Sequence, residues 1–219
     1  MRGRGRTGPR RIETRARRGD AGPAPVVRMT GPEDTPLVIV RSRAELRDWL
    51  AENHATARTA WLATYKKHHP DYLPWGQAVE ELLCWGWVDA QVAALDADRM
   101  KHRVAPRNES SAWSAVNKEI VARMRAEGRM TPAGEAKIAA AEANGMWQFL
   151  DDVERLEVPD DLAEALGPLM PVWNGWPRSV KRGTLEWIKT AKTAPTRIRR
   201  VDEVVESARA GLRPSPFRR

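Results

Sequence analysis

The order of helix and strand signals along the chain is the feature that most restricts its fold. Apolar runs that alternate or are β-branched, as is typical of strands, occur only between residues 37 and 104 of the 219. After residue 110 the pattern is helical, with a Ser or Thr before apolar residues spaced three or four apart. Strands confined to one part of a chain and followed by helices indicate an α+β fold. We therefore predict a mainly helical α+β protein.

The first part of this pattern predicts a small antiparallel sheet packed with helices. Ser42 followed by Glu45 is a capping box, in which each side chain satisfies a free backbone N–H at a helix start. Gly86 is a typical helix stop. Residues 87–92 and 99–104 flank an Asp-Ala-Asp turn and resemble a hairpin. The expected elements are strands over 37–40, 59–67, 87–92 and 99–104 and helices over 42–54 and 76–85.

The second part predicts a succession of helices. Hydroxyl side chains stand where these helices should begin, because Ser and Thr cap free backbone N–H groups. The expected caps are Ser111, Thr131, Ser179 and Thr196. The expected buried face of the first of these helices is Trp113, Val116, Ile120 and Met124.

Composition divides the chain into four segments. Residues 1–34 are rich in Arg, Gly, Pro and Thr and contain too few apolar residues to offset the entropy cost of ordering. We expect them to form a disordered basic tail. Residues 35–150 are expected to form a Trp-rich α+β domain, residues 151–214 a helical C-terminal module, and residues 215–219 a second tail.

The net charge of +8 is concentrated at the two ends of the chain. Residues 1–30 carry a net charge of +7 and residues 196–219 carry +4, so residues 31–195 carry −3. A dedicated nucleic-acid-binding fold needs a basic footprint on its folded part. We therefore expect no nucleic-acid partner, other than nonspecific binding through the Arg-rich tail.

Cysteine usage and hydropathy indicate the compartment. Cys84 is the single cysteine, so an intramolecular disulfide is impossible, which fits a reducing environment. The sequence has no apolar run long enough to span a membrane and no apolar stretch after its N-terminal arginines that would form a signal peptide. We predict a cytoplasmic protein without a membrane span.

The sequence contains none of the motifs that usually carry catalysis. Its four histidines lack metal-ligand spacing, and Cys84 lies among apolar helix residues without a nucleophile signature. Glycine-rich phosphate loops and the common hydrolase and metalloprotease motifs are also missing. We therefore expect no catalytic residue, no metal and no cofactor.

Tryptophan is the most unusual component, with ten against two Phe and two Tyr. One interpretation is a core in which polar side chains accept hydrogen bonds from indole N–H groups. The other is a concave ligand pocket with indole walls, a charged pair of Asp89 and Arg107, and Asn117 as a hydrogen-bonding floor. Both interpretations stay open. The candidate ligand-binding residues are Trp85, Trp87, Asp89, Arg107, Trp113 and Asn117.

A basic segment lies between the last two predicted helices. It is either a solvated helix junction, where cations suit the end of the preceding helix, or a patch that binds an anion or an acidic partner. The candidate residues of such a patch are Lys192, Thr196, Arg197 and Arg200.

Several ordered motifs resemble the bacteriocin-protection, YdeI/OmpD-associated family. Residues 78–89 are similar to that family's "AVEEALCFGWIDG" segment, with Trp85 in place of Phe. Ala90 stands where the family tends to have Gly, and residues 167–180 differ from the family's usual run. The further similar motifs are residues 106–107, 111–117, 128–134, 145–147, 187–192 and 196–200, so that the likeness spans residues 36–213.

The resemblance implies a biological context more than a reaction. The family is named for protection against bacteriocins and for association with an outer-membrane porin. It implies a non-enzymatic stress or envelope-defence protein that acts by binding a protein partner or a small ligand. The alternative is a small-molecule-binding protein or enzyme that uses the Trp-walled pocket.

Overall fold

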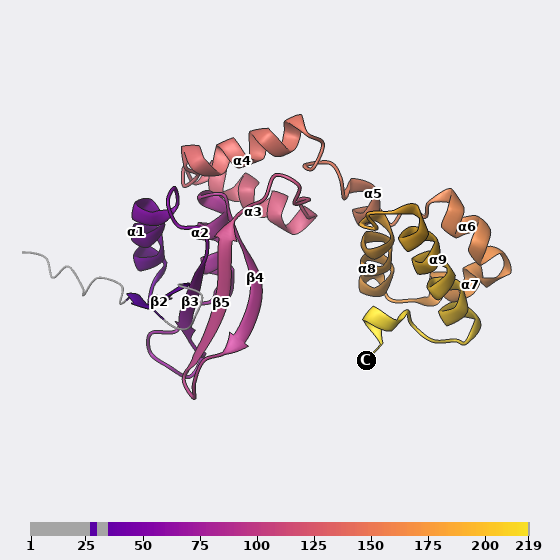
Figure 1. Cartoon of the computed structure of the whole chain (residues 1–219), viewed down its shortest axis with the longest axis horizontal. Coiled ribbons are helices and arrows are strands. Elements are labelled where there is room, and N and C mark those ends of the chain that lie inside the picture. The colour runs from indigo at the N-terminus through magenta and orange to yellow at the C-terminus, as the bar shows by residue number, and fades with distance from the viewer. Residues whose placement is uncertain (1–26, 30–34, 219) are drawn as a thin grey trace, which may run out of the picture.

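The computed structural model describes residues 27–29 and 35–218. Most of the predicted basic tail therefore lies outside the described residues. Within that segment, Val27–Met29 is a strand, β1, which pairs antiparallel with the next strand. The rest forms an α+β lobe, which contains α1 to α4, and a helical lobe, which contains α5 to α9 (Figure 1). The predicted mainly helical α+β fold class is confirmed.

The sheet is mixed rather than antiparallel. Its strand order is β1-β2-β3-β5-β4, and every neighbouring pair is antiparallel except β2 and β3, which are parallel. The prediction of an antiparallel sheet was wrong at this pair because α1, Arg43–Asn53, returns the chain to the end where β2 began. The other strands are β2 (Pro36–Ile39), β3 (Ala60–Tyr65), β4 (Trp87–Ala94) and β5 (Arg99–Pro106).

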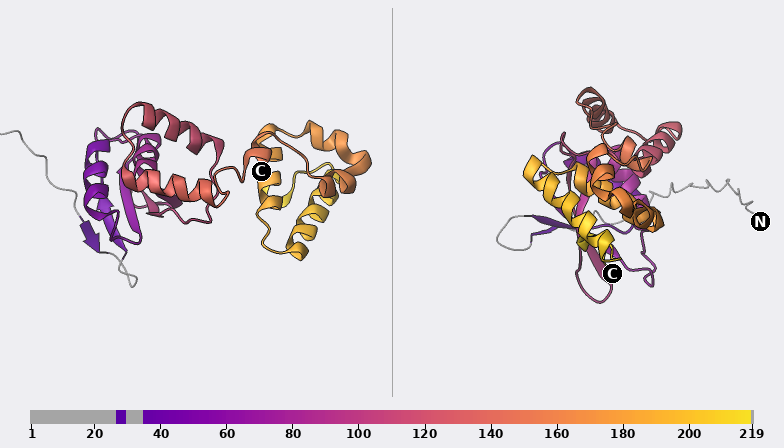
Figure 2. Two further views of the ribbon diagram at one scale, coloured as in Figure 1. Left: turned by 90° about the horizontal axis from the view of Figure 1, so that it is seen from above. Right: turned by 90° about the vertical axis from the view of Figure 1, so that its right-hand side faces the viewer.

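Helices α1 and α2, Trp75–Cys84, pack on one face of the sheet. Apolar residues at helical spacing in α1 meet the alternating inward residues of the strands, and Trp49 contacts Trp87 edge-on at 5.7 Å. Helices α3, Ala115–Ala126, and α4, Pro132–Ala143, pack on α2 through a second core, on the far side from the sheet (Figure 2).

Helix α4 approaches the end of α2 very closely. Thr131 caps α4 as predicted, since its hydroxyl accepts from the Gly134 N–H, and it also donates to the Cys84 carbonyl at 2.7 Å. A Cβ on Gly134 would lie 2.7 Å from the Cys84 carbonyl carbon and closer still to its oxygen. Glycine at this position therefore sets the distance between the two helices.

The start of α3 differs from the prediction. Ser114, not Ser111, caps this helix, because the Trp113 N–H is bonded to the Met146 carbonyl and residues 111–113 stay outside the helix. Val116, predicted to be buried, is 63% exposed, because this helix buries Val121 and Met124 instead.

The C-terminal lobe is built from short helices around one apolar core, which includes Leu162, Trp173, Leu185 and Val204. Two caps differ from the prediction: α8 follows Pro177 rather than Ser179, and α9 is capped by Thr193 rather than Thr196. The elements are α5 (Asp151–Glu154), α6 (Asp160–Leu166), η1 (Gly167–Leu169), α7 (Met170–Gly175), α8 (Arg178–Lys189) and α9 (Ala194–Arg209).

The end of the chain, predicted as a tail over residues 215–219, forms a 3-10 helix, η2, at Ser215–Phe217. Phe217 packs against Gly183 of α8, where a Cβ would lie 2.6 Å from its ring. The Ser215 N–H also donates to Glu203 of α9 at 2.9 Å. These contacts hold residues 215–217 against α8 and α9, although their composition alone had predicted a tail.

The two lobes meet at the start of α3. Glu154 of α5 accepts from the Ala115 N–H at 3.3 Å and from Arg182 of α8 at 2.7 Å. Lys118 of α3 forms an ion pair with Asp151. Over the described residues, no helix combines the length and hydropathy that a membrane crossing requires.

Candidate functional site

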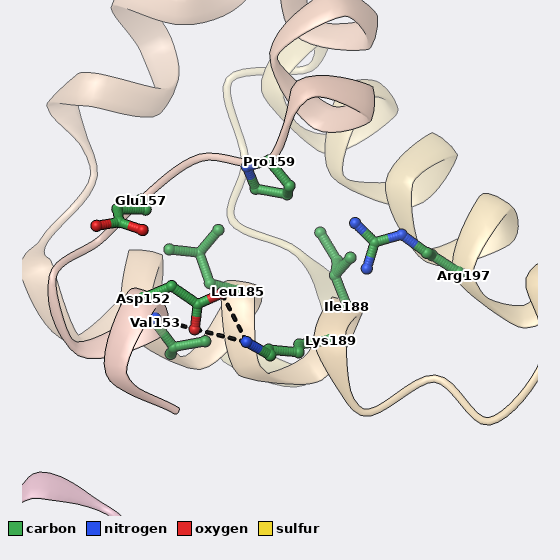
Figure 3. Close-up of a pocket in the computed structure, with 8 residues that line it drawn as sticks. All are labelled: Asp152, Val153, Glu157, Pro159, Leu185, Ile188, Lys189 and Arg197. Atoms are coloured by element: carbon green, nitrogen blue, oxygen red, sulfur yellow. Dashed lines mark hydrogen bonds and ion pairs between the residues drawn. The ribbon is translucent and has the colours of Figure 1, made fainter. Parts of the chain in front are cut away.

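A groove of about 130 Å³ lies on the C-terminal lobe, where α5, α8 and α9 come together (Figure 3). Segments about 45 positions apart in the sequence form its walls, because α8 and α9 return beside α5 and the segment that follows it. We call this site the C-terminal groove. Its lining residues are Asp152, Val153, Glu157, Pro159, Leu185, Ile188, Lys189 and Arg197.

The floor of the C-terminal groove is apolar. Val153, Leu185 and Ile188 are at most 3% exposed and belong to the core of the lobe. Leu185 and Ile188 reach the groove together because they are three residues apart on α8. The floor is therefore a rigid apolar surface that only a small group can reach.

Ion pairs form the rim of the groove. The Lys189 ammonium donates to both oxygens of Asp152 at 2.6 Å, and the Arg197 guanidinium donates to both oxygens of Asp161 at 2.7 and 2.8 Å. Partial burial raises the pKa of Asp152, but the hydrogen bonds from Lys189 and from the Val153 N–H, together with the positive charge of Lys189, outweigh burial and hold that pKa below its ordinary value. The hydrogen bond from Arg197 likewise lowers the pKa of Asp161. The carboxylates of Asp152 and Asp161 are therefore charged at neutral pH.

These rim charges remain available to a partner. The side chains of the Lys189–Asp152 pair are 28% and 39% exposed, and those of the Arg197–Asp161 pair are 33% and 48% exposed. Exposed pairs of this kind contribute about 0–1 kcal/mol each. A binding partner can therefore replace one member of a pair at little cost.

The size of the groove indicates what it can hold. Sites for drug-sized ligands and cofactors usually have volumes of about 300–1,000 Å³. A volume of about 130 Å³ is instead sufficient for one aliphatic or aromatic side chain. An apolar floor with charges of both signs around it suits a side chain of a protein partner flanked by charged residues.

One of the four residues of the predicted basic patch lines this groove, and the other three do not. Arg197 lines the groove, while Arg200 donates to the Trp187 carbonyl and lies 5.1 Å from the Trp187 ring. The Thr196 N–H bonds to the capping hydroxyl of Thr193. Lys192 is exposed in the turn between α8 and α9.

The structure divides the six predicted pocket residues among separate places. Trp87, Asp89 and Asn117 line one cavity of about 20 Å³, which has room for about one water molecule. Asp89 is exposed and accepts from the Trp75 indole N–H at 3.3 Å. This cavity is too small for an organic ligand.

Arg107 and Trp113 are buried elsewhere. Arg107 is 4% exposed, and its guanidinium lies 3.9 Å from the centre of the Trp113 ring and donates to the Ala112 carbonyl. Burial lowers the pKa of Arg107 to about 10. Its Nε and Nη1 atoms have no partner among the described residues. Trp85 is half-buried beside His54, with the ring centroids 4.6 Å apart. Asp89 and Arg107 thus do not form the predicted pair.

Two family models match separate parts of the chain. Residues 38–137 match one described as a domain of unknown function (DUF8412). Residues 155–211 match the family described as bacteriocin-protection, YdeI or OmpD-associated. No curated protein and no solved structure gave a match.

The YdeI/OmpD-associated match confirms the predicted resemblance in the C-terminal part of the chain. The similar motifs at 78–89 and 111–117 fall instead within the domain of unknown function. Of the groove residues, all but Asp152 and Val153 lie inside the YdeI/OmpD-associated match. The groove is thus a feature of that module.

A buried ion cluster in the α+β lobe was not predicted from the sequence. The Glu81 carboxylate is 0% exposed and accepts from Arg43 at 2.6 Å, from Arg47 at 2.8 Å and from Arg129. Burial raises the pKa of Glu81, but the three arginines outweigh it and lower that pKa. One feature of the sequence could have indicated this cluster. Glu81 is an acidic residue next to Leu82, on the apolar side of a predicted helix. The cluster joins α1, α2 and the segment before α4, so its role is to hold the lobe together.

Proposed function

We propose that the chain is a non-enzymatic cytoplasmic protein of stress and envelope defence, which acts by binding a protein partner through the C-terminal groove. The observation that carries this proposal is the coincidence of the groove with the segment that matches the YdeI/OmpD-associated family. That family is described as bacteriocin-protection, which supports defence of the cell envelope as the context.

The chemistry of the groove supports a protein partner. A buried Leu or Phe side chain contributes about 1.5–3 kcal/mol, and a few such anchors dominate most protein interfaces. Lys189 and Arg197 stand on one side of the apolar floor and Glu157 on the other (Figure 3). A partner segment with one apolar side chain between charged residues would complement both features.

The state of the single cysteine supports the cytoplasm. Cys84 is unpaired and buried, and burial raises the pKa of its thiol to about 11. A thiol in this state neither crosslinks chains nor reacts readily, as is usual for structural cysteines in a reducing compartment.

Replacing Arg197 with alanine tests the proposal. In host cells that lack the gene and are challenged with a bacteriocin, the wild-type chain should restore survival, and Arg197→Ala should restore at most about a tenth of it. The physical reason is that this change removes a rim charge without touching the floor. An exposed ion pair contributes little to stability, so the fold should persist.

The matched control is Arg209→Ala. Arg209 also lies on α9 and pairs with an acid, Glu206, but it does not line the groove. This variant should protect as well as the wild type. Full protection by Arg197→Ala would show that the groove is not the working site.

The second candidate is a small-molecule-binding protein or enzyme whose site contains Arg107 without Asp89 and Asn117, because the structure separates Arg107 from those two residues. It is favoured by one observation, the buried Arg107 guanidinium without a carboxylate partner among the described residues. Titration of the intrinsic tryptophan fluorescence with a metabolite library tests it. Saturable quenching that Arg107→Ala abolishes and Asp89→Asn leaves unchanged, in folded protein, would favour this candidate over the groove.

A further inference from the structure

The second face of the sheet has no helix in its apolar cluster. Leu37, Ile39 and Ala63 are buried there, with Trp61, Tyr65 and Leu95 packed against them. All six come from the strands or the turn between β4 and β5, whereas α1 and α2 pack on the opposite face. The described part of the chain thus presents a strand-only face with two aromatic rings, and we call it the second face.

Strand register places a row of cations beside these rings. Trp61 pairs with Arg103, Ala63 with Lys101, and Tyr65 with Arg99. Residues paired directly across an antiparallel ladder point to the same face. The central strand therefore contributes aromatic rings and the neighbouring strand contributes three positive charges.

The same register brings no acid to the second face of these strands. On β4, Gln91 and Ala93 lie opposite Arg103 and Lys101. The positions that alternate onto this face in β2 to β5 are Leu37, Ile39, Trp61, Ala63, Tyr65, Val88, Gln91, Ala93, Arg99, Lys101, Arg103 and Ala105.

Two of these cations are not neutralised by a carboxylate of the described residues. The Lys101 ammonium lies 4.6 Å from the centre of the Trp61 ring, and Arg103 is exposed and only bonds weakly to the Thr59 hydroxyl at 3.4 Å. Arg99, by contrast, forms an ion pair with Asp96 in the adjacent turn. Free positive charge is therefore concentrated around Trp61.

We propose that the second face binds single-stranded nucleic acid. Aromatic rings on a sheet face stack unpaired bases, while neighbouring Lys and Arg hold the phosphates. This activity is separate from the C-terminal groove and goes beyond the proposed function.

The strand register thus brings together cations and an aromatic ring whose proximity the sequence alone did not show. Lys101 and Arg103 look like scattered charges along a hairpin, and only their pairing with β3 puts them next to Trp61. Binding would exchange the Lys101 ammonium over the Trp61 ring for a base, and the freed ammonium would meet a phosphate. The Tyr65 ring, stacked on His69 at 3.9 Å, offers a second such exchange.

Fluorescence anisotropy with a fluorescein-labelled oligonucleotide of fifteen thymidines tests this proposal on the full chain. The double variant Lys101→Ala with Arg103→Ala should bind at least tenfold more weakly at low salt. The slope of log K against log salt should fall by about 1.4, since each phosphate contact to a single strand contributes about 0.7. Trp61→Leu should weaken binding roughly tenfold through the lost stacking.

The matched control is Arg123→Ala with Arg125→Ala, which removes the same charge from α3 on the other side of the lobe. It should leave the affinity within about twofold of the wild type. Equal loss in both double variants, no loss in the double variant of the second face, or tighter binding to the duplex of the same length would each overturn the proposal. The cation variants alter surface side chains, so they test it even if Trp61→Leu impairs folding.

Discussion

Replacing Glu81 with glutamine is expected to lower the free energy of unfolding by about 3–5 kcal/mol, because it leaves a cluster of partly buried arginines without their counter-charge. Three guanidinium groups, those of Arg43, Arg47 and Arg129, converge on this fully buried carboxylate. Urea denaturation followed by tryptophan fluorescence would measure the loss.

The control for this change is Glu135→Gln. Glu135 also pairs with an arginine, Arg125, but the two side chains are 40% and 43% exposed, so the loss should stay below about 1 kcal/mol. If Glu81→Gln cost no more than this control, the cluster would not hold the helices of the α+β lobe together.

The same carboxylate makes stability depend on acid pH. The pKa of Glu81 in the folded protein lies below the ordinary value of 4.5. Its contribution to stability is therefore complete above pH 4.5 and is lost as the pH falls through the folded-state pKa. Stability curves of the wild type and Glu81→Gln should converge in that acid range.

Alanine at Gly134 is expected to have the second-largest effect, a loss of about 3 kcal/mol. The added Cβ would lie 2.7 Å from the Cys84 carbonyl carbon, which is backbone and cannot rotate away. The helices α2 and α4 would have to separate, breaking the hydrogen bond between Thr131 and Cys84. Thermal or urea unfolding would measure this.

Gly76 offers a control with the opposite sign. It lies in the first turn of α2, as Gly134 does in α4, but nothing comes within 4 Å of a Cβ placed there. Gly76→Ala should therefore stabilise the protein by about 0.5–1 kcal/mol through helix propensity alone. A loss at Gly76 equal to that at Gly134 would mean that the close approach is not responsible.

Local signals in the sequence were enough to locate most elements. The hydroxyls of Ser42 and Thr131 cap the helices predicted for them, and Gly86 follows α2 with a positive φ of 71°. The direction of β3 against β2 was not readable, because the choice between parallel and antiparallel pairing depends on where α1 carries the chain. The cap at Ser114 was missed because a tertiary hydrogen bond of Trp113 keeps the preceding residues out of the helix.

The candidate site was predictable in part. Arg197 was identified from the charge of its segment, but the groove needs Asp152 and Leu185, which only the packing of α5 and α8 brings beside it. Asp89 and Arg107 lie near each other in sequence yet face different surroundings, because the hairpin carries one to an exposed strand position and the other into the core. The number of residues between Asp89 and Arg107 in the sequence does not predict that the two side chains lie in different surroundings.

Site-specific photo-crosslinking from position 192 tests the central claim most directly. Lys192 is exposed in the turn that joins α8 and α9, two helices that supply groove residues, so we expect a photoreactive amino acid there to reach a partner bound at the C-terminal groove. In living cells we predict one protein adduct from position 192, none from the exposed position of Glu142 on α4, and loss of the adduct with Arg197→Ala. An adduct that persists unchanged with Arg197→Ala, or no adduct from position 192, would contradict binding of a partner at the groove.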